Sequence, residues 1–328
     1  MARARSSLTT PAFWDLHLHG VAGIDFMTAS SDAMAFACAE LGKHGTGAFA
    51  PTLLTAEPRL LTEACRRWGT FLEHCARNPR WLPKTAALPL GLHLEGPFLN
   101  PMMAGAHPKR CLRRPSPEAA LGLVREARGH VAIVTLAPEL PGAPATIRRL
   151  VARGIRVQLG HTLASADEAA RAVRAGASGI THLYNAMRTH HRSPGVLTPL
   201  ARGHVTAEII TDGLHLDRDF VRWCCAASPH RLYAVSDGCS AVGARAGQRL
   251  TLGSLVLKRV GDAAVVASNG ILAGGATYLT GHPRGFASRA VLPLFYELQR
   301  GFFPRAAAAV KLRNHFDARS LRFLEASV

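Results

Sequence analysis

The amino-acid sequence predicts an α/β protein with the fold of a (β/α)8 TIM barrel, in one domain that spans residues 1–328. Apolar strand-like segments alternate with amphipathic helical segments, which is the pattern of a parallel sheet with crossover helices. Eight strand candidates occur in a chain of 328 residues, and such a barrel typically takes about 250. The candidate functional residues follow these strands, at the end where barrel active sites lie.

The strands are predicted near residues 13–19, 46–53, 88–95, 131–137, 155–160, 179–183, 205–211 and 231–237. The clearest helix, 57–77, has apolar residues at helical spacing and is followed by an Asn-Pro pair. Ser165 and Glu168 form the capping box that begins a second helix, and Asp217 is the expected N-cap of a third helix near 217–227. After strand eight we expect a β-hairpin insertion at about 248–268 and a helical C-terminal tail.

The composition and charge of the chain argue against several classes of protein. No segment approaches the roughly 18 consecutive apolar residues of a membrane helix, and no apolar secretory segment follows the basic start, so we expect a cytoplasmic protein. The formal charge of +17 raises the question of nucleic-acid binding, but the arginines are thinly spread and aromatic residues make up only 6%. We therefore do not expect nucleic acid as a partner. The seven scattered cysteines predict reduced thiols, and Cys239 is not expected to be a nucleophile.

His17 and His19 end the first predicted strand, in the segment Asp-Leu-His-Leu-His-Gly. Side chains two apart in a strand point to the same face, so both imidazoles can bind one divalent cation. Neutral imidazole suits zinc, iron, nickel and copper. A chance His-x-His pair on a surface strand is the alternative, and the residues downstream argue against it.

The later strands carry the remaining candidates. Glu95 ends strand three before a Gly-Pro turn, whereas His161 and His182 follow strands five and six, which are adjacent in a barrel. Two histidines, one carboxylate and an open position form the catalytic zinc arrangement. Asp237, at the end of strand eight, is positioned to move a proton between a metal-activated water and a leaving amine, and His215 to polarise a scissile carbonyl. Each residue alone could be structural, but the set together favours a metal-dependent hydrolase.

Several motifs occur in the order seen in one family. They are Gly91-Leu-His-Leu-Glu-Gly-Pro-Phe-Leu-Asn100, Gly105-Ala-His107, Gly160-His161, Thr181-His-Leu-Tyr-Asn-Ala-Met187, Arg192-Ser-Pro-Gly195, Asp212-Gly-Leu-His215, Ser236-Asp237 and Leu272-Ala-Gly274. Over roughly residues 13–280 the chain resembles the N-acetylglucosamine-6-phosphate deacetylases, a branch of the metal-dependent amidohydrolase superfamily. The resemblance implies hydrolysis of a phosphorylated N-acetyl amino sugar, with acetate released.

The resemblance also implies roles for individual residues. Glu95, His161 and His182 would be the primary ligands of a divalent ion, zinc or alternatively iron or another divalent ion, with Asp237 as the general acid/base. Because His17 and His19 are both present, either one or two ions can be expected. The implied substrate-binding residues are His107, Asn185, Ala186, Arg192, His215, Leu272, Ala273 and Gly274, with Arg192 on the phosphate. The resemblance leaves a homodimer open as the assembly.

Some alternatives stay open at this point. Another amidohydrolase activity, such as cyclic-amide hydrolysis or deamination, uses the same scaffold, because a fold does not determine a substrate. A catalytically impaired barrel, or a basic barrel that only binds a partner, is a further alternative. Arg192 discriminates between the deacetylase and another amidohydrolase activity, because a guanidinium suits the phosphate of the deacetylase substrate. A solvated arginine is nevertheless common in an arginine-rich chain.

The ends of the chain depart from the family pattern. Similar deacetylases have a small β-sandwich domain built from residues before the first barrel strand and after the last barrel helix. This chain begins about a dozen residues before strand one, and its arginine-rich tail lacks the expected terminal strand. The sequence therefore predicts that the small flanking domain is missing or reduced.

Overall fold

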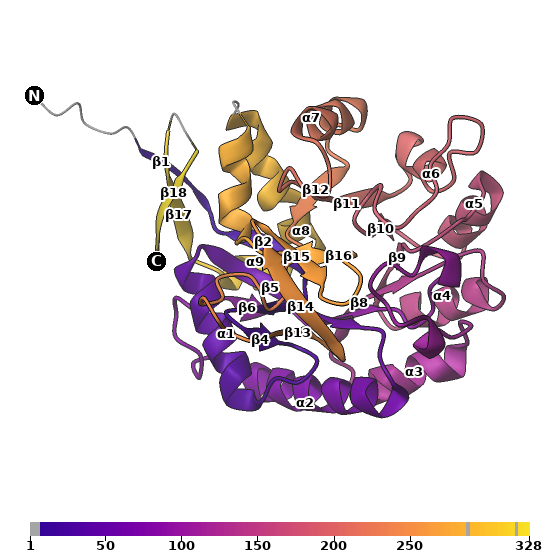
Figure 1. The fold of residues 1–328 in the computed structure, drawn as a ribbon, viewed down its shortest axis with the longest axis horizontal. Helices are drawn as coiled ribbons and strands as arrows, with labels where there is room; N and C mark the ends of the chain where they lie inside the picture. The colour runs from indigo at the N-terminus through magenta and orange to yellow at the C-terminus, as the bar shows by residue number, and fades with distance from the viewer. Residues whose placement is uncertain (1–6, 287–288, 319–320) are drawn as a thin grey trace, which may run out of the picture.

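The computed structural model describes residues 7–286, 289–318 and 321–328, and its centre is a parallel eight-stranded barrel (Figure 1). The barrel strands are β2 (Phe13–Leu18), β5 (Thr46–Leu54), β7 (Leu92–Glu95), β8 (Val131–Leu136), β9 (Arg156–Leu159), β10 (Gly179–Ile180), β11 (Thr206–Ile210) and β12 (Leu232–Val235). They pair in the order β12-β11-β10-β9-β8-β7-β5-β2, so sequential strands are neighbours throughout. The predicted fold class is confirmed.

The first and last strands join along a short seam that completes the barrel. The backbone N–H of His19 donates to the carbonyl of Gly238 at 2.6 Å, and that of Asp237 donates to the carbonyl of His17 at 3.0 Å. Below them, the buried carboxylate of Asp15 accepts the backbone N–H of Ser236 at 3.1 Å. The seam therefore places the His-x-His segment directly beside Asp237.

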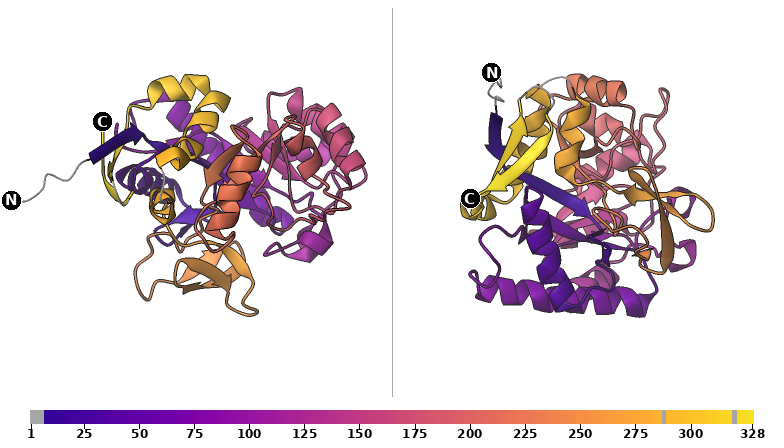
Figure 2. Two further views of the ribbon diagram at one scale, coloured as in Figure 1. Left: turned by 90° about the horizontal axis from the view of Figure 1, so that it is seen from above. Right: turned by 60° about the vertical axis from the view of Figure 1, so that its left-hand side comes forward.

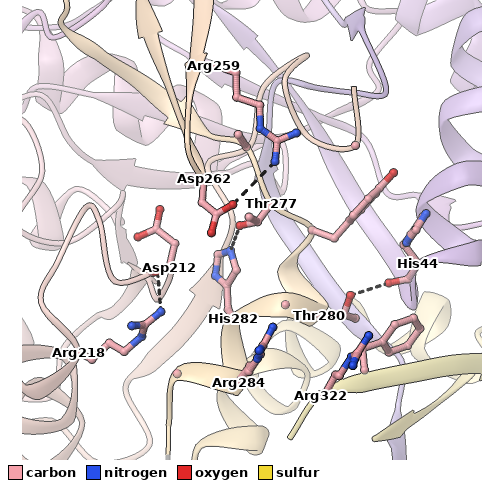
Figure 3. A pocket seen from close by; sticks show the side chains of 16 residues that line it. His44, Asp212, Arg218, Arg259, Asp262, Thr277, Thr280, His282, Arg284 and Arg322 are labelled. Atoms are coloured by element: carbon pink, nitrogen blue, oxygen red, sulfur yellow. Dashed lines mark hydrogen bonds and ion pairs between the residues drawn. The ribbon is translucent and has the colours of Figure 1, made fainter. Parts of the chain in front are cut away.

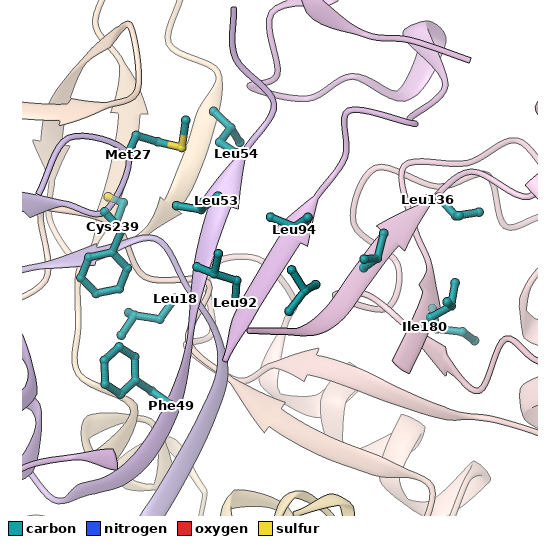
Figure 4. Packing of buried hydrophobic residues seen from close by; sticks show 14 of the residues in the cluster. Leu18, Met27, Phe49, Leu53, Leu54, Leu92, Leu94, Leu136, Ile180 and Cys239 are labelled. Atoms are coloured by element: carbon teal, nitrogen blue, oxygen red, sulfur yellow. The ribbon is translucent and has the colours of Figure 1, made fainter. Parts of the chain in front are cut away.

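The crossover helices lie outside the barrel. They are α1 (Ser31–Lys43), α2 (Pro58–Arg77), α3 (Pro117–Glu126), α4 (Ala143–Val151), α5 (Ala166–Arg174), α6 (Leu197–Ala201) and α7 (Arg218–Ala227). The structure confirms the capping box of Ser165 and Glu168 and the N-cap at Asp217. Trp68 of α2 packs edge-on against Phe26 and Phe49, with ring centroids 5.1 and 6.5 Å apart, which holds this helix on the barrel. Figure 4 shows the same core continuing between neighbouring strands.

Two strands differ from the prediction. Strand three is split into β6 (Leu88–Pro89) and β7, because the chain turns at Gly91, which has a φ of 128°. Strand six ends at Ile180 rather than at residue 183. His182 has a φ of 27°, outside the β region, so the chain leaves the sheet before it reaches this histidine.

A four-stranded antiparallel sheet follows the barrel where the sequence predicts a hairpin. Its strands are β13 (Leu250–Leu252), β14 (Leu255–Val260), β15 (Ala263–Val266) and β16 (Leu272–Gly275), in that order. The glycine-rich turn after β15 thus leads into a fourth strand, β16. A backbone bridge between Gly275 and Gly238 holds this sheet against the mouth of the barrel.

The C-terminal segment is less helical than predicted. It contains two 3₁₀ segments, η3 (Leu279–Gly285) and η4 (Arg289–Phe295), and two short helices, α8 (Glu297–Phe302) and α9 (Pro304–Ala309). Gln299 of α8 is buried and donates to the carbonyls of Ala234 and Leu294, at 3.2 and 2.8 Å, which fixes the segment under the barrel.

The flanking domain was predicted to be missing or reduced, and a small three-stranded sheet is present, so it is reduced; the expectation that the tail lacks a terminal strand is wrong. β1 (Ser7–Pro11) pairs antiparallel with β17 (Arg313–Asp317), which pairs with β18 (Phe323–Ser327), and Figure 2 shows the three strands together. Phe13 stacks on Phe295 and Phe316, with ring centroids 4.6 and 5.3 Å apart, and so ties this sheet to the barrel. The terminal strand lacks the family pattern in sequence, which is why it was missed. Among the described residues, no helix is both long and apolar enough to cross a membrane.

Candidate functional site

Glu95 is the centre of a buried cluster at the carboxyl end of the barrel. It ends β7 and is 2% exposed, and five histidines direct Nε2 atoms at its carboxylate. The Nε2 distances are 3.0 Å for His161 and His182 and 3.5 Å for His17, all to Oε1, and 3.3 Å for His19 and His107, both to Oε2. The structure therefore brings together all the predicted metal ligands, and it adds His107 to them.

The cluster fits a divalent cation. The Nε2 atoms of His17 and His19 lie 3.2 Å apart, and those of His161 and His182 lie 3.1 Å apart. Such pairs of lone-pair nitrogens facing one carboxylate form a donor set that a cation satisfies. The Nδ1 atom of His161 lies 2.7 Å from the carbonyl of Met103, so it carries the hydrogen and leaves the lone pair of Nε2 able to bind a cation.

Asp237 lies beside this cluster, directly after β12. Its Oδ1 is 3.3 Å from Nε2 of His17 and 3.4 Å from Nε2 of His19, and its Oδ2 is 3.7 Å from Nε2 of His215. Burial acts to raise the pKa of Asp237, but the neighbouring His17 and His19 together hold it below its ordinary value. The carboxylate is therefore ionised at neutral pH and able to accept a proton.

His215 is held by a second carboxylate. Its Nδ1 donates to Oδ2 of Asp212 at 2.7 Å, and Oδ1 of Asp212 accepts the backbone N–H groups of Leu214 and His215. Burial acts to lower the pKa of His215, whereas the hydrogen bond to Asp212 raises it, and the pKa lies above its ordinary value. The Nε2 atom, which points toward Asp237, is thus suited to donate a hydrogen bond.

A cavity of about 150 Å³ opens onto these groups. It is lined by nearly all the predicted site residues, namely His19, Glu95, His107, His161, His182, Asn185, Ala186, His215, Asp237, Leu272, Ala273 and Gly274. His17 lies deeper, with an exposed fraction of 0%. Arg192 does not line the cavity: it is exposed on the loop after β10, where its backbone N–H donates to Nδ1 of His190 at 3.2 Å.

The backbone is strained at the residues that form the site. His161, Ala186 and Asp237 have φ values of 50°, 48° and 48°, and His182 has the φ of 27° noted above. Non-glycine residues seldom adopt this left-handed conformation, and they do so mainly where the surrounding structure requires it for function. These turns aim the side chains inward from the strand ends.

Two buried polar residues, His93 and Glu208, extend below the cluster. The Nδ1 of His93 is 3.1 Å from the carbonyl of Leu16 and its Nε2 is 2.7 Å from the hydroxyl of Thr135. Both ring nitrogens are satisfied, so His93 is structural. Glu208, which contacts His17 at 2.9 Å, was missed by the sequence analysis. The signal was present, because an acidic residue interrupts the apolar run of strand seven.

A larger cavity, of about 680 Å³, lies on the other side of Asp212 and is lined by several arginines (Figure 3). Arg218 donates to the carbonyl of Asp212 there, and the buried His282 contacts the hydroxyls of Thr211 and Thr277. Within residues 7–286, 289–318 and 321–328, none of the groups able to hold a metal ion includes a residue of this cavity. Among the described residues, the groups able to hold a metal ion lie at or below the smaller cavity.

Comparisons with known proteins agree with this geometry. The sequence profile of the amidohydrolase family matches residues 8–259. The chain is 36% identical to the N-acetylglucosamine-6-phosphate deacetylase of Danio rerio over 282 residues, which is 82% of this chain and 67% of that protein. It is 32% identical to the N-acetylgalactosamine-6-phosphate deacetylase of Escherichia coli O157:H7 over 268 residues, 81% of this chain and 69% of that protein. The chain thus spans about two thirds of the length of these curated relatives.

A solved structure is similar over almost the whole chain. A variant of N-acetyl-D-glucosamine-6-phosphate deacetylase from Mycobacterium smegmatis, in complex with N-acetyl-D-glucosamine-6-phosphate, superposes with a TM-score of 0.86 and 30% identity. The match covers 98% of this chain and 86% of that one. With the profile match, the sequence relatives and the barrel-mouth cluster in agreement, this chain belongs to the amidohydrolase family, on the branch of the amino-sugar-phosphate deacetylases.

Proposed function

We propose that this chain hydrolyses the acetamide of N-acetylglucosamine-6-phosphate, releasing glucosamine-6-phosphate and acetate in amino-sugar catabolism. The observation that carries the proposal is the buried carboxylate of Glu95 with five histidine Nε2 atoms within 3.5 Å, next to an ionised Asp237. The deacetylase names of the relatives and of the similar solved structure support this substrate class.

The cluster supports a divalent metal ion, which we propose to be zinc. Glu95, His161 and His182 would hold it, and His17 and His19 would hold it jointly or take a second ion. When bound, such an ion acts as a Lewis acid that polarises a carbonyl and lowers the pKa of water toward about 7.

The remaining steps belong to side chains of the chain itself. Asp237 accepts the proton of the attacking water and delivers it to the amide nitrogen, which must be protonated before the amine can leave. His215, whose Nδ1 is committed to Asp212 at 2.7 Å, donates from Nε2 to the carbonyl oxygen as negative charge develops there. Because both groups project into the same buried cavity, they act with little competition from bulk water.

Substrate recognition is proposed for the rim of this cavity. His107, Asn185, Ala186 and the turn 272–274 would contact the sugar. Arg192 would bind the phosphate, although it lies outside the cavity lining. A bidentate guanidinium is well suited to a phosphate dianion, and the exposed loop position of Arg192 leaves its side chain accessible.

The decisive experiment measures acetate and free amine released from N-acetylglucosamine-6-phosphate by the purified chain, with and without a chelator. Metal content is determined on the same samples. Chelator-sensitive release that returns with zinc is the expected result. Metal binding without release from any N-acetylated sugar phosphate would refute the proposed function and leave the fold untouched.

A second substrate deserves a parallel measurement. The relative from Escherichia coli O157:H7 is named for N-acetylgalactosamine-6-phosphate, which differs only in the configuration at one carbon. The ratio of kcat/KM for the two sugars would decide between them. The single domain over residues 1–328, the cytoplasmic location, the homodimer and the absence of a nucleic-acid partner stay predictions.

A further inference from the structure

Glu208 is a buried carboxylate on β11, with its side chain inside the barrel and an exposed fraction of 0%. Its Oε2 lies 2.9 Å from Nδ1 of His17 and accepts the backbone N–H of His182 at 3.1 Å. Its Oε1 accepts Nε2 of Gln158 at 2.8 Å, and Gln158 in turn accepts the hydroxyl of Tyr233 at 2.9 Å. The carboxylate is thus held directly by three donors, the His17 ring on β2, the Gln158 amide on β9 and the backbone of His182 after β10. Tyr233 of β12 supports it only through Gln158.

These contacts act on the orientation of two of the proposed metal ligands. Because Glu208 accepts only, the hydrogen of His17 must be on Nδ1, which leaves the lone pair of Nε2 facing the cluster. That Nε2 is 3.5 Å from Glu95 and 3.3 Å from Asp237. The same oxygen of Glu208 also holds the backbone of His182, whose φ of 27° needs support from its surroundings.

The neighbouring His93 offers an alternative interpretation of the same group. Ligand atoms of His17, His93 and Glu208 lie within 4.8 Å of one another, which by proximity alone could hold an ion. However, Nδ1 of His93 lies 3.1 Å from a backbone carbonyl and Nε2 lies 2.7 Å from the Thr135 hydroxyl, so neither has a free lone pair to offer. The group below the cluster therefore supports the site and does not form a second one.

We propose that Glu208 is a positioning residue that fixes the tautomer and ring direction of His17 and the backbone of His182 for metal binding. A carboxylate behind a histidine ligand fixes the ring and raises its basicity, and loss of such a partner typically weakens metal binding by about 10- to 100-fold. For its kinetic consequences the inference rests on the proposed function. Its central claim concerns metal affinity, which can be measured without turnover.

The test compares Glu208→Gln with a matched control, Asp25→Asn. Asp25 is also a buried carboxylate with three donors, the backbone N–H groups of Met27 and Gly253 and the hydroxyl of Thr251. It makes no hydrogen bond to a proposed ligand and acts on His19 only through its charge. Zinc affinity is measured by competition with a chromophoric chelator, and the state of His17 by NMR of ¹⁵N-histidine-labelled, zinc-free protein. We expect Glu208→Gln to weaken zinc binding by about 10- to 100-fold and to change the tautomer signal of His17, while Asp25→Asn changes neither.

A second variant keeps the proposal testable if Glu208→Gln does not fold. Gln158→Met preserves the shape of the side chain but removes the donor to Oε1, so Glu208 is held less firmly and zinc binding should weaken by a smaller factor. Wild-type zinc affinity in both variants, or an equal loss in Asp25→Asn, would overturn the positioning role. If the wild-type chain binds zinc but releases no acetate, the proposed function fails while the affinity ratios still decide this inference.

Discussion

Asp237→Asn is the substitution that most directly tests the chemistry. The amide has the size of the carboxylate but cannot accept the proton of the attacking water. Two described neighbours are poorly suited to replace it: His215 lies 3.7 Å away but has a raised pKa, and the Glu95 carboxylate is surrounded by five histidines. General acid–base catalysis contributes about 100- to 10,000-fold, so kcat should fall by at least about 100-fold, which is about 3 kcal/mol in activation free energy.

The assay follows acetate release under saturating zinc, with metal content and the thermal unfolding midpoint measured on the same protein. Asp262→Asn is the control, since Asp262 is an exposed carboxylate 3.8 Å from Arg259 and away from the cluster. The control should retain wild-type turnover. Turnover of Asp237→Asn within threefold of wild type would refute the proton-transfer role. Loss of zinc from this variant would show instead that Asp237 is a required ligand.

Three further substitutions test other parts of the site. Arg192→Ala should raise KM by about 10- to 100-fold, because a hydrogen bond to a charged group contributes about 1.5–3 kcal/mol. An equal rise in KM for the unphosphorylated sugar would contradict a contact with the phosphate. Gly274→Ala places a Cβ 2.5 Å from the carbonyl of Asp237 at a φ of 121°, so both kcat and the unfolding midpoint should fall. Gly270→Ala, with a φ of 72° and open space around it, is the control, and equal losses would show that φ strain alone is responsible. Cys239→Ala should keep near-wild-type turnover, because burial raises the pKa of the thiol to about 12, and a loss above 100-fold would restore Cys239 as a candidate nucleophile.

The sequence predicted the parts of the site that depend on strand ends. Glu95 and Asp237 stand where an apolar run stops, and the regular alternation of strands and helices shows that those ends meet at one mouth. Glu208 escaped prediction because it lies inside a strand. There, the same residue type could face the barrel interior or solvent, and only the closed barrel shows that it meets His17. Arg192 shows a different limit of sequence-based prediction. The motif identifies the residue, but it does not determine where an exposed loop side chain lies.

The small flanking sheet was predicted only as missing or reduced, for a different physical reason. β1 and β17 each contain one apolar side chain that could mark a strand, Leu8 and Phe316, and β18 has Phe323 and Leu324 side by side, so none shows the apolar alternation by which a half-buried strand is recognised. Phe13 of the barrel stacks between Phe295 and Phe316 and holds the sheet in place, a contact between residues about 300 positions apart that no local pattern can reveal.

The hydrogen bonds between the first and last strands do not depend on the site side chains, so substitutions at the site can test the chemistry without unfolding the barrel. His17 and Asp237 are brought together by a backbone hydrogen bond of 3.0 Å, and the Asp15–Ser236 contact beneath it joins residues 221 positions apart. Neither contact uses the side chain of His17 or Asp237, so replacing those side chains leaves the seam closed. His182 differs, because its backbone depends on the carboxylate of Glu208. If Glu208→Gln loses zinc binding while the barrel stays folded, the defect therefore lies in the orientation of the metal ligands. It does not lie in the groups that react with the substrate.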